Sequence, residues 1–312
     1  MGDLIPLFPL GTPLFPGIVL PLQVFEPRYR ALVRDLLALP EGEQRRFGVV
    51  AIRQGWEVEQ VAPAEALYDV GCTAVLQVVR PQPDGGFAVV TVGGERFRLL
   101  DVLVSGRGRD ADDDGDADDD GDADGDGDAD GDGEAGDDGP PYLRAEVEWL
   151  ADEEAAEEAA GDQQAVADAP AAGAPGPDDG LVAEVASGSL ALLERGVGGL
   201  FTRYVTAVAG LQAGLDSEEV GRAAELAGAG EDPIGAAALL EAVAGDPRAL
   251  SYLVASAALL TTEDRQALLA ESATRRRLVT ESRMLRRELT LLEAVGAVPA
   301  PMHQFAGSLS LN

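Results

Sequence analysis

A run of 29 residues between Asp110 and Asp138 constrains the fold of this chain more than any other feature. Seventeen of the 29 are Asp or Glu, none is basic, and no aliphatic side chain is larger than that of alanine. Such a segment cannot bury enough apolar surface to offset the entropy lost when it orders. It predicts a disordered acidic insertion, over residues 105–141, between two folded parts of the sequence.

A second biased stretch lies between residues 151 and 180. It holds nine acidic residues and no basic ones in an Ala/Gly/Pro background, which is typical of a linker. Together the two tracts carry −26 of the formal charge of −33. The rest of the chain is therefore only mildly acidic, and the charge says little about its folded surface.

Missing residue types exclude several kinds of chemistry. The chain has no lysine, one histidine (His303) and one cysteine (Cys72). Without lysine it can hold neither a Walker-type phosphate-binding loop nor a Ser-Lys dyad. Zinc sites of Cys and His, and internal disulfides, need at least two such residues, and the acidic run does not fit the EF-hand spacing. We expect no cofactor, no metal site and no catalytic residue, and a cytoplasmic location.

The N-terminal stretch from Leu4 to Phe25 has no charged residue and is long enough on paper to cross a bilayer. Five prolines recur in it, each removing a backbone donor, so a continuous helix cannot form. Met1-Gly2-Asp3 also lacks the positive charge that opens a signal peptide. We therefore expect neither a membrane helix nor a cleaved leader.

Residues 1–104 alternate short apolar runs with turn signals, which predicts a β-rich domain. Pro83-Asp84-Gly85-Gly86 predicts the turn of a hairpin, and Gly93-Gly94 predicts a break before a further strand. Pro27 opens one helix, whose apolar stripe is Tyr29, Leu32, Val33, Leu36 and Leu37. Apolar and polar residues alternate again over residues 142–150, which predicts another strand. The acidic insertion is therefore expected to join two strands of one sheet. The strands are expected at residues 47–52, 72–79, 87–92, 96–104 and 142–150.

Residues 181–298 are rich in Leu and Ala and are interrupted by helix-start signals, which predicts a bundle of about five helices. The last is expected from roughly Ser272 to Val295, with its leucines on one face. Gly196-Val197-Gly198-Gly199 predicts a helix flexure or break. The expected N-caps are Asp216, Asp232, Asp246 and Thr261.

Four N-terminal motifs together resemble the substrate-binding N-terminal domain of Lon proteases: Leu4-Ile5-Pro6-Leu7-Phe8-Pro9-Leu10, Leu14-Phe15-Pro16-Gly17, Leu20-Pro21-Leu22 and Phe25-Glu26-Pro27-Arg28-Tyr29-Arg30. Val70-Gly71-Cys72-Thr73-Ala74 and Gly93-Gly94-Glu95-Arg96-Phe97 are similar to later strands of that family. The resemblance covers residues 1–104 and 142–298. It implies an α+β chain with a PUA-like β pseudo-barrel (1–150, including the insertion), the linker (151–180), an α-helical bundle (181–298) and a tail (299–312).

The resemblance also implies a function. It indicates a non-catalytic module that recognises unfolded or degron-bearing polypeptides, as an adaptor or substrate selector, with a Lon-type protease as a further partner. Apolar surface between the β domain and the bundle would receive the polypeptide, with main-chain pairing at a sheet edge. The alternative is RNA binding, because PUA-like folds elsewhere bind RNA, although the acidic field of the chain disfavours nucleic acid.

Two groups of residues are candidate sites. The first is a polypeptide-binding rim made by Phe25, Glu26, Arg28, Tyr29 and Arg30. A helix N-terminus held to the sheet by buried Arg–carboxylate pairing is the structural alternative for the same residues. The second is a basic patch on the last helix that would dock a partner, made by Arg275, Arg276, Arg283, Arg286 and Arg287, with Arg277 between them. A solvated or internally paired face, or an RNA contact, are the alternatives there.

Overall fold

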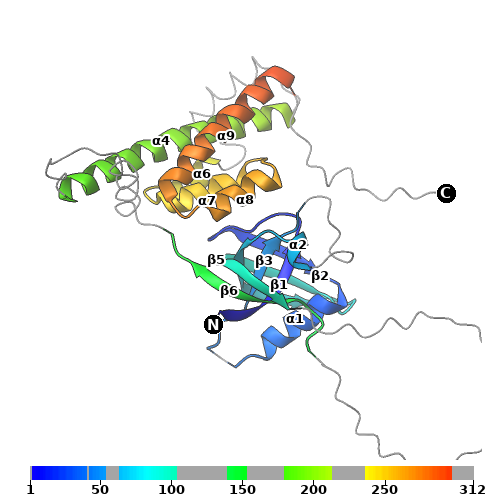
Figure 1. Cartoon of the computed structure of the whole chain (residues 1–312). Coiled ribbons are helices and arrows are strands. Elements are labelled where there is room, and N and C mark those ends of the chain that lie inside the picture. The colour runs from blue at the N-terminus through cyan, green and yellow to red at the C-terminus, as the bar shows by residue number, and fades with distance from the viewer. Residues whose placement is uncertain are drawn as a thin grey trace, which may run out of the picture.

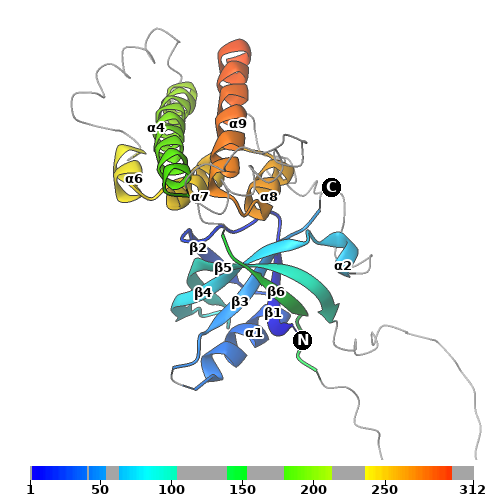
Figure 2. The same cartoon turned by 60° about the vertical axis from the view of Figure 1, so that its left-hand side comes forward.

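The structure, a computed structural model, describes residues 2–40, 42–53, 63–103, 139–152, 179–212 and 236–296. A sheet occupies one side of the molecule and the later helices occupy the other (Figure 1). Helices α7 and α8 lie next to the sheet, whereas α4 and α9 extend away from it (Figure 2). The chain is therefore of the α+β class, as the sequence predicts. The domain boundaries stay a prediction.

Six strands form one mixed sheet. Their order is β2-β5-β4-β3-β1-β6, and β5 also pairs with β6, so five of the strands close into a ring while β2 stays outside it. Only β1 and β3 run parallel; the other pairs are antiparallel. The strands are β1 (Asp3–Leu10), β2 (Val19–Val24), β3 (Arg46–Ala51), β4 (Val70–Pro81), β5 (Phe87–Leu103) and β6 (Arg144–Leu150).

The β4–β5 hairpin forms as predicted. Gly85 adopts a φ of 79°, and the Gly86 amide donates to the Asp84 carboxylate at 3.0 Å. Strands β5 and β6 are neighbours in register from Arg96–Leu150 to Leu103–Arg144. The prediction that the chain between them joins two strands of one sheet is therefore confirmed, and residues 105–138 of the acidic insertion lie outside the described residues.

The break predicted at Gly93-Gly94 is wrong, because β5 runs unbroken through both glycines. The loop after β1 crosses the strand at this point. The Gly93 amide donates to the Ile18 carbonyl at 2.9 Å, and the Gly93 carbonyl accepts from the Gly17 amide at 2.8 Å. A Cβ at Gly93 would collide with the Phe15 carbonyl. The glycine therefore permits a close backbone crossing instead of ending a strand.

Two helices accompany the strands and five more follow them in the described part of the chain. Helix α1 buries Tyr29, Leu32, Val33 and Leu36, as its stripe predicts, but leaves Leu37 exposed. Of the two outcomes predicted at Gly196–Gly199, a break is wrong, since α4 passes through these residues, and a flexure stays a prediction. The helices are α1 (Pro27–Ala38), α2 (Pro63–Ala66), α4 (Asp179–Gln212), α6 (Ala236–Ala242), α7 (Pro247–Ala257), α8 (Thr262–Ala270) and α9 (Thr274–Val295).

Side-chain caps start two of these helices. The Asp246 carboxylate accepts from the Ala249 amide at 2.9 Å, and the Thr261 hydroxyl accepts from the Asp264 amide at 3.1 Å. Both caps confirm the sequence prediction. The predicted caps Asp216 and Asp232, like His303, lie outside the described residues. None of the described helices is both long and apolar enough to cross a membrane.

One hydrophobic core joins the sheet to the helices. Phe8, Phe15 and Phe47 from the β part share a buried cluster with Tyr252 of α7 and Leu268 of α8. A second cluster lies among α4, α7 and α9, where it buries Leu278, Leu285, Leu289 and Leu292. The leucine face predicted for the last helix therefore packs inside the helical part.

Candidate functional site

The segment from Phe25 to Arg30 divides between surface and core. Phe25 follows β2 and is 69% exposed. Tyr29 is buried, with its ring stacked on Phe8 at 4.0 Å between centroids. Burial raises the pKa of the Tyr29 phenol, against a smaller lowering by Arg28. Of the predicted rim residues, Phe25 is thus placed to touch a partner, whereas Tyr29 supports α1 from inside.

The charged residues of this segment stay near the surface. Arg28 and Glu26 form an ion pair at 2.9 Å in which both side chains are partly exposed. The Arg28 guanidinium also lies 4.8 Å from the centre of the Tyr29 ring. Arg30 reaches the β4–β5 turn, where its guanidinium lies beside Gly85. The expected buried pairing to the sheet is therefore not what holds the helix: the pair is local and partly exposed, and the Tyr29 ring is the anchor.

Strand β2 is the open edge of the sheet. Among the described strands it pairs with β5 alone, and Val19 at its start is exposed. Pro21 lies in the middle of β2 and has no amide hydrogen. A proline in an edge strand blocks part of the edge against pairing with another strand. Main-chain pairing here is therefore limited to a few donors.

The arginines of α9 differ in their surroundings. Arg276 pairs with Glu271 at 3.1 Å, and Arg287 pairs with Asp264 at 2.6 Å and with Glu288 at 2.8 Å. Arg275 also has an interaction partner. Arg283 and Arg286 show no carboxylate partner within the described ranges, and Arg286 donates to the Ser282 hydroxyl at 2.7 Å. Three of the five arginines of the predicted patch, Arg275, Arg276 and Arg287, therefore already interact with other residues of this chain.

Arg277, in the middle of that cluster, does not reach the surface at all. It is 0% exposed, its Nε donates to the Ser251 hydroxyl at 2.7 Å, and its guanidinium lies 4.1 Å from the centre of the Tyr252 ring. Periodicity alone placed Arg277 with its exposed neighbours. It instead faces the sheet side of the helical part, where it belongs to a polar junction.

The centre of that junction is Asp152, which the acidic, Ala/Gly/Pro-rich composition of residues 151–180 assigns to the linker. The Asp152 carboxylate accepts from Arg96 of β5 at 2.7 Å and from the Tyr252 hydroxyl at 2.7 Å. It also lies 3.5 Å from Arg277 and 3.6 Å from Arg248. One carboxylate thus joins the end of β6, the middle of β5 and helices α7 and α9. Arg96 stands within a motif of the family resemblance, but its partners are more than 50 residues away and no local pattern indicates them.

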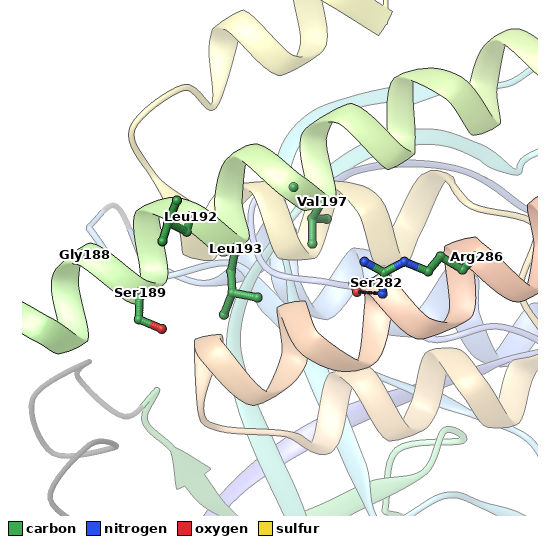
Figure 3. Close-up of a pocket in the computed structure, with 8 residues that line it drawn as sticks. Gly188, Ser189, Leu192, Leu193, Val197, Ser282 and Arg286 are labelled. Carbon is green, nitrogen blue, oxygen red and sulfur yellow. Dashed lines mark hydrogen bonds between the residues drawn. The ribbon is translucent and has the colours of Figure 1, made fainter.

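A groove separates the N-terminal half of α4 from α9 (Figure 3). Its volume is about 540 Å³. Helix α4 contributes Leu192, Leu193 and Val197 together with Gly188 and Gly196. Helix α9 contributes Ser282 and Arg286, whose hydrogen bond closes the opposite wall. No local pattern in the sequence indicates this groove, because glycines such as Gly196 in a helical stretch predict a flexure or a break instead.

Metal-ligating side chains and the Cys72 thiol are two features of the described residues that bear on catalysis. No group of three His, Cys, Asp or Glu side chains in the described part of the chain has the arrangement to hold a metal ion. Cys72 is buried, as predicted, and burial raises the pKa of its thiol. Burial therefore disfavours the thiolate, which is the nucleophilic form of cysteine.

Comparison with known proteins gives these surfaces a context. Residues 4–287 match the family described as the ATP-dependent protease La (LON) substrate-binding domain. The chain belongs to this family. Lon protease 1 of Herpetosiphon aurantiacus is 23% identical over 294 residues, which are 93% of this chain and 25% of that protein. Lon protease of Parabacteroides distasonis is 31% identical over 100 residues, which are 32% of this chain and 11% of that protein.

The chain thus spans a quarter or less of the length of these Lon relatives. Among solved structures, a Lon N-terminal domain protein from Xanthomonas campestris aligns with a TM-score of 0.43 and 20% identity, over 89% of this chain and 95% of that one. The N-terminal domain of the Mycobacterium avium complex Lon protease aligns with a TM-score of 0.43 and 15% identity, over 91% and 98%.

Proposed function

We propose that the chain is a non-catalytic polypeptide-binding module that selects unfolded or degron-bearing polypeptides, as an adaptor or substrate selector in the cytoplasm. The match of residues 4–287 to the Lon substrate-binding domain family carries this proposal. A Lon-type protease is the partner to which it would present them. The assignment of the β part to the PUA-like class rests on the sequence resemblance.

Exposed apolar side chains beside the open sheet edge support a role in binding polypeptides. Val19, the first residue of β2, and Phe25, which follows the strand, are both largely exposed. Aromatic side chains bury large areas at low entropic cost and often dominate interfaces. Pro21 leaves few main-chain donors at this edge, so side-chain contacts are expected to supply most of the affinity.

The arginine patch gives less support to RNA binding. Arg276 and Arg287 are paired with carboxylates, and Arg277 is buried. Nucleic-acid binding draws its affinity from arginines and lysines that neutralise phosphates, and this chain has no lysine. Few arginines of α9 in the described part of the chain are therefore left to neutralise the phosphates of RNA.

The test is binding of the full chain to a permanently unfolded protein, reduced and carboxymethylated lactalbumin, with native lactalbumin as the comparison. Phe25→Ala is expected to weaken binding about 5- to 30-fold, the range that corresponds to about one or two kcal/mol. Leu100→Ala is the matched control, since Leu100 is also an exposed apolar residue but lies at the far end of β5.

Binding of unfolded but not native lactalbumin, with the expected loss in the Phe25 variant only, would support the proposal. Absence of binding to the unfolded protein would refute it. Capture of RNA with a steep decrease in affinity as salt rises would instead favour the alternative function.

A further inference from the structure

We infer that the groove between α4 and α9 binds an amphipathic helical segment of a client polypeptide whose acidic side chains contact Arg283 and Arg286. This inference rests on the proposed polypeptide-binding function and assigns it a second site, apart from Phe25. The shape, the lining and the charges of the groove each point to this occupant (Figure 3).

The apolar side of the groove favours burial of a partner's apolar side chains. Leu192 is 65% exposed although it lies in a long helix beside a packed core. With Leu193 and Val197 it forms an apolar wall along about one and a half turns of α4, in which Val197 is itself already buried. The volume of about 540 Å³ falls in the range of roughly 300–1,000 Å³ typical of binding sites. Removing this apolar surface from water would stabilise a complex.

The small residues on the same wall favour a helix as the occupant. Gly188 and Gly196 line the groove, and a Cβ on either would meet no atom within 4 Å. Glycines at this spacing let a second helix approach closely along its length. From Gly188 to Val197 the wall extends about 14 Å, which accommodates helical side chains at positions i, i+3 or i+4, and i+7.

The charges on the α9 wall favour acidic side chains in the occupant. Arg286 lines the groove, and Arg283 precedes it by three residues, so the two are neighbours on the helix surface. Both are exposed and neither has a carboxylate partner in the described part of the chain. Arg276 and Arg287 on the same helix do have such partners. A carboxylate from the bound segment would complete the pairing at this wall.

The test uses the full chain and a fluorescein-labelled synthetic peptide of about 18 residues, long enough to form a helix. The peptide carries leucines at i, i+3, i+4 and i+7 with glutamates beside them. A second peptide replaces every glutamate with lysine. The expected result is that the glutamate peptide binds at least about tenfold more tightly, as fluorescence anisotropy measures.

Two variants test the groove itself. Gly196→Leu fills it without an internal collision and is expected to weaken binding of the glutamate peptide at least about tenfold. Gly198→Leu is the matched control, because Gly198 also has open space at its Cβ position but lies about 200° around the helix. The double variant Arg283→Glu, Arg286→Glu reverses the charge of the α9 wall. It is expected to bind the lysine peptide more tightly than the glutamate peptide.

Loss in the Gly196 variant, retention in the Gly198 variant and the reversed preference together support the inference. Equal binding by the two glycine variants, or no preference between the peptides, overturns it. A lower melting temperature for Gly196→Leu alone would mean that another segment of this chain occupies the groove. A change in oligomeric state would mean that a second copy of the chain occupies it. Either result also overturns the inference. Binding of unfolded lactalbumin in the same preparations separates failure of this inference from failure of the proposed function.

Discussion

Glu281 is a buried carboxylic acid that the helical part leaves without a hydrogen bond. It is 0% exposed, and neither carboxyl oxygen has a hydrogen-bond partner among the described residues. Burial raises its pKa well above the ordinary 4.5, although Arg277 four residues earlier lowers it. A pKa that is higher in the folded state than in the unfolded state contributes stability to the fold. That stability is complete below the unfolded-state pKa and is lost as pH rises through the folded-state pKa. Glu281 should therefore destabilise the fold at alkaline pH.

Glu281→Gln keeps the shape of the side chain and removes the titration. We expect the variant to exceed the wild type in free energy of unfolding by about 1–3 kcal/mol at about pH 8, with the difference shrinking toward about pH 5. Urea unfolding at the two pH values measures it. Glu293→Gln, at an exposed position of α9, should stay within about 0.5 kcal/mol of the wild type at both. An effect of Glu281→Gln that is the same at both pH values would contradict the assignment.

The crossing of β5 by the loop after β1 depends on a glycine in mid-strand. Gly93→Ala places a Cβ against the Phe15 carbonyl, and backbone atoms cannot move aside as a side chain can. We expect a loss of about 1–3 kcal/mol or more in the free energy of unfolding. Gly11→Ala, in the crossing loop itself but with open space at Cβ, should change stability by no more than about 0.5 kcal/mol. Similar losses for both variants would show that the collision with the Phe15 carbonyl is not what requires the glycine.

The same glycine shows why the elements were only partly predictable. Alternation of apolar residues correctly placed β3, β4, β6 and the β4–β5 turn, because these depend on local pattern. A glycine pair is also a local signal for a break, yet Gly93 is needed for a contact with residues 15–18, which no window around it contains. In α4, the glycines likewise leave room beside the helix without interrupting it.

The candidate site was harder to predict than the fold, and the arginines of α9 show the reason. Helical periodicity grouped six arginines into one patch, but Arg277 is turned toward Asp152 and Tyr252. Whether an arginine on a helix is exposed depends on what the rest of the chain packs against it. The partners of Arg277 and Arg96 come from three other parts of the chain, so only the assembled molecule separates the junction from the surface.

At the scale of the whole molecule, Asp152 joins the sheet to the helices. Arg96 and Arg277 are both buried beside it, so its removal would leave two buried cations short of an anion. Breaking a buried ion pair by removing one partner costs about 3–5 kcal/mol. We expect Asp152→Ala to lose that amount in urea unfolding. Arg248→Ala is the matched control, since Arg248 is 61% exposed and 3.6 Å from Asp152, and should cost no more than about 1 kcal/mol.

The loss of the junction should also uncouple the two parts of the molecule. Trp149 lies in β6, so its fluorescence reports the β part, whereas helical circular dichroism reports mainly α4 to α9. In the wild type the two signals should change together, because the parts share a buried core and this carboxylate. In Asp152→Ala the helical signal should be lost at lower urea than the fluorescence. Coincident transitions in the variant would mean that the shared apolar core alone couples the sheet to the helices, and that the junction adds stability without transmitting it.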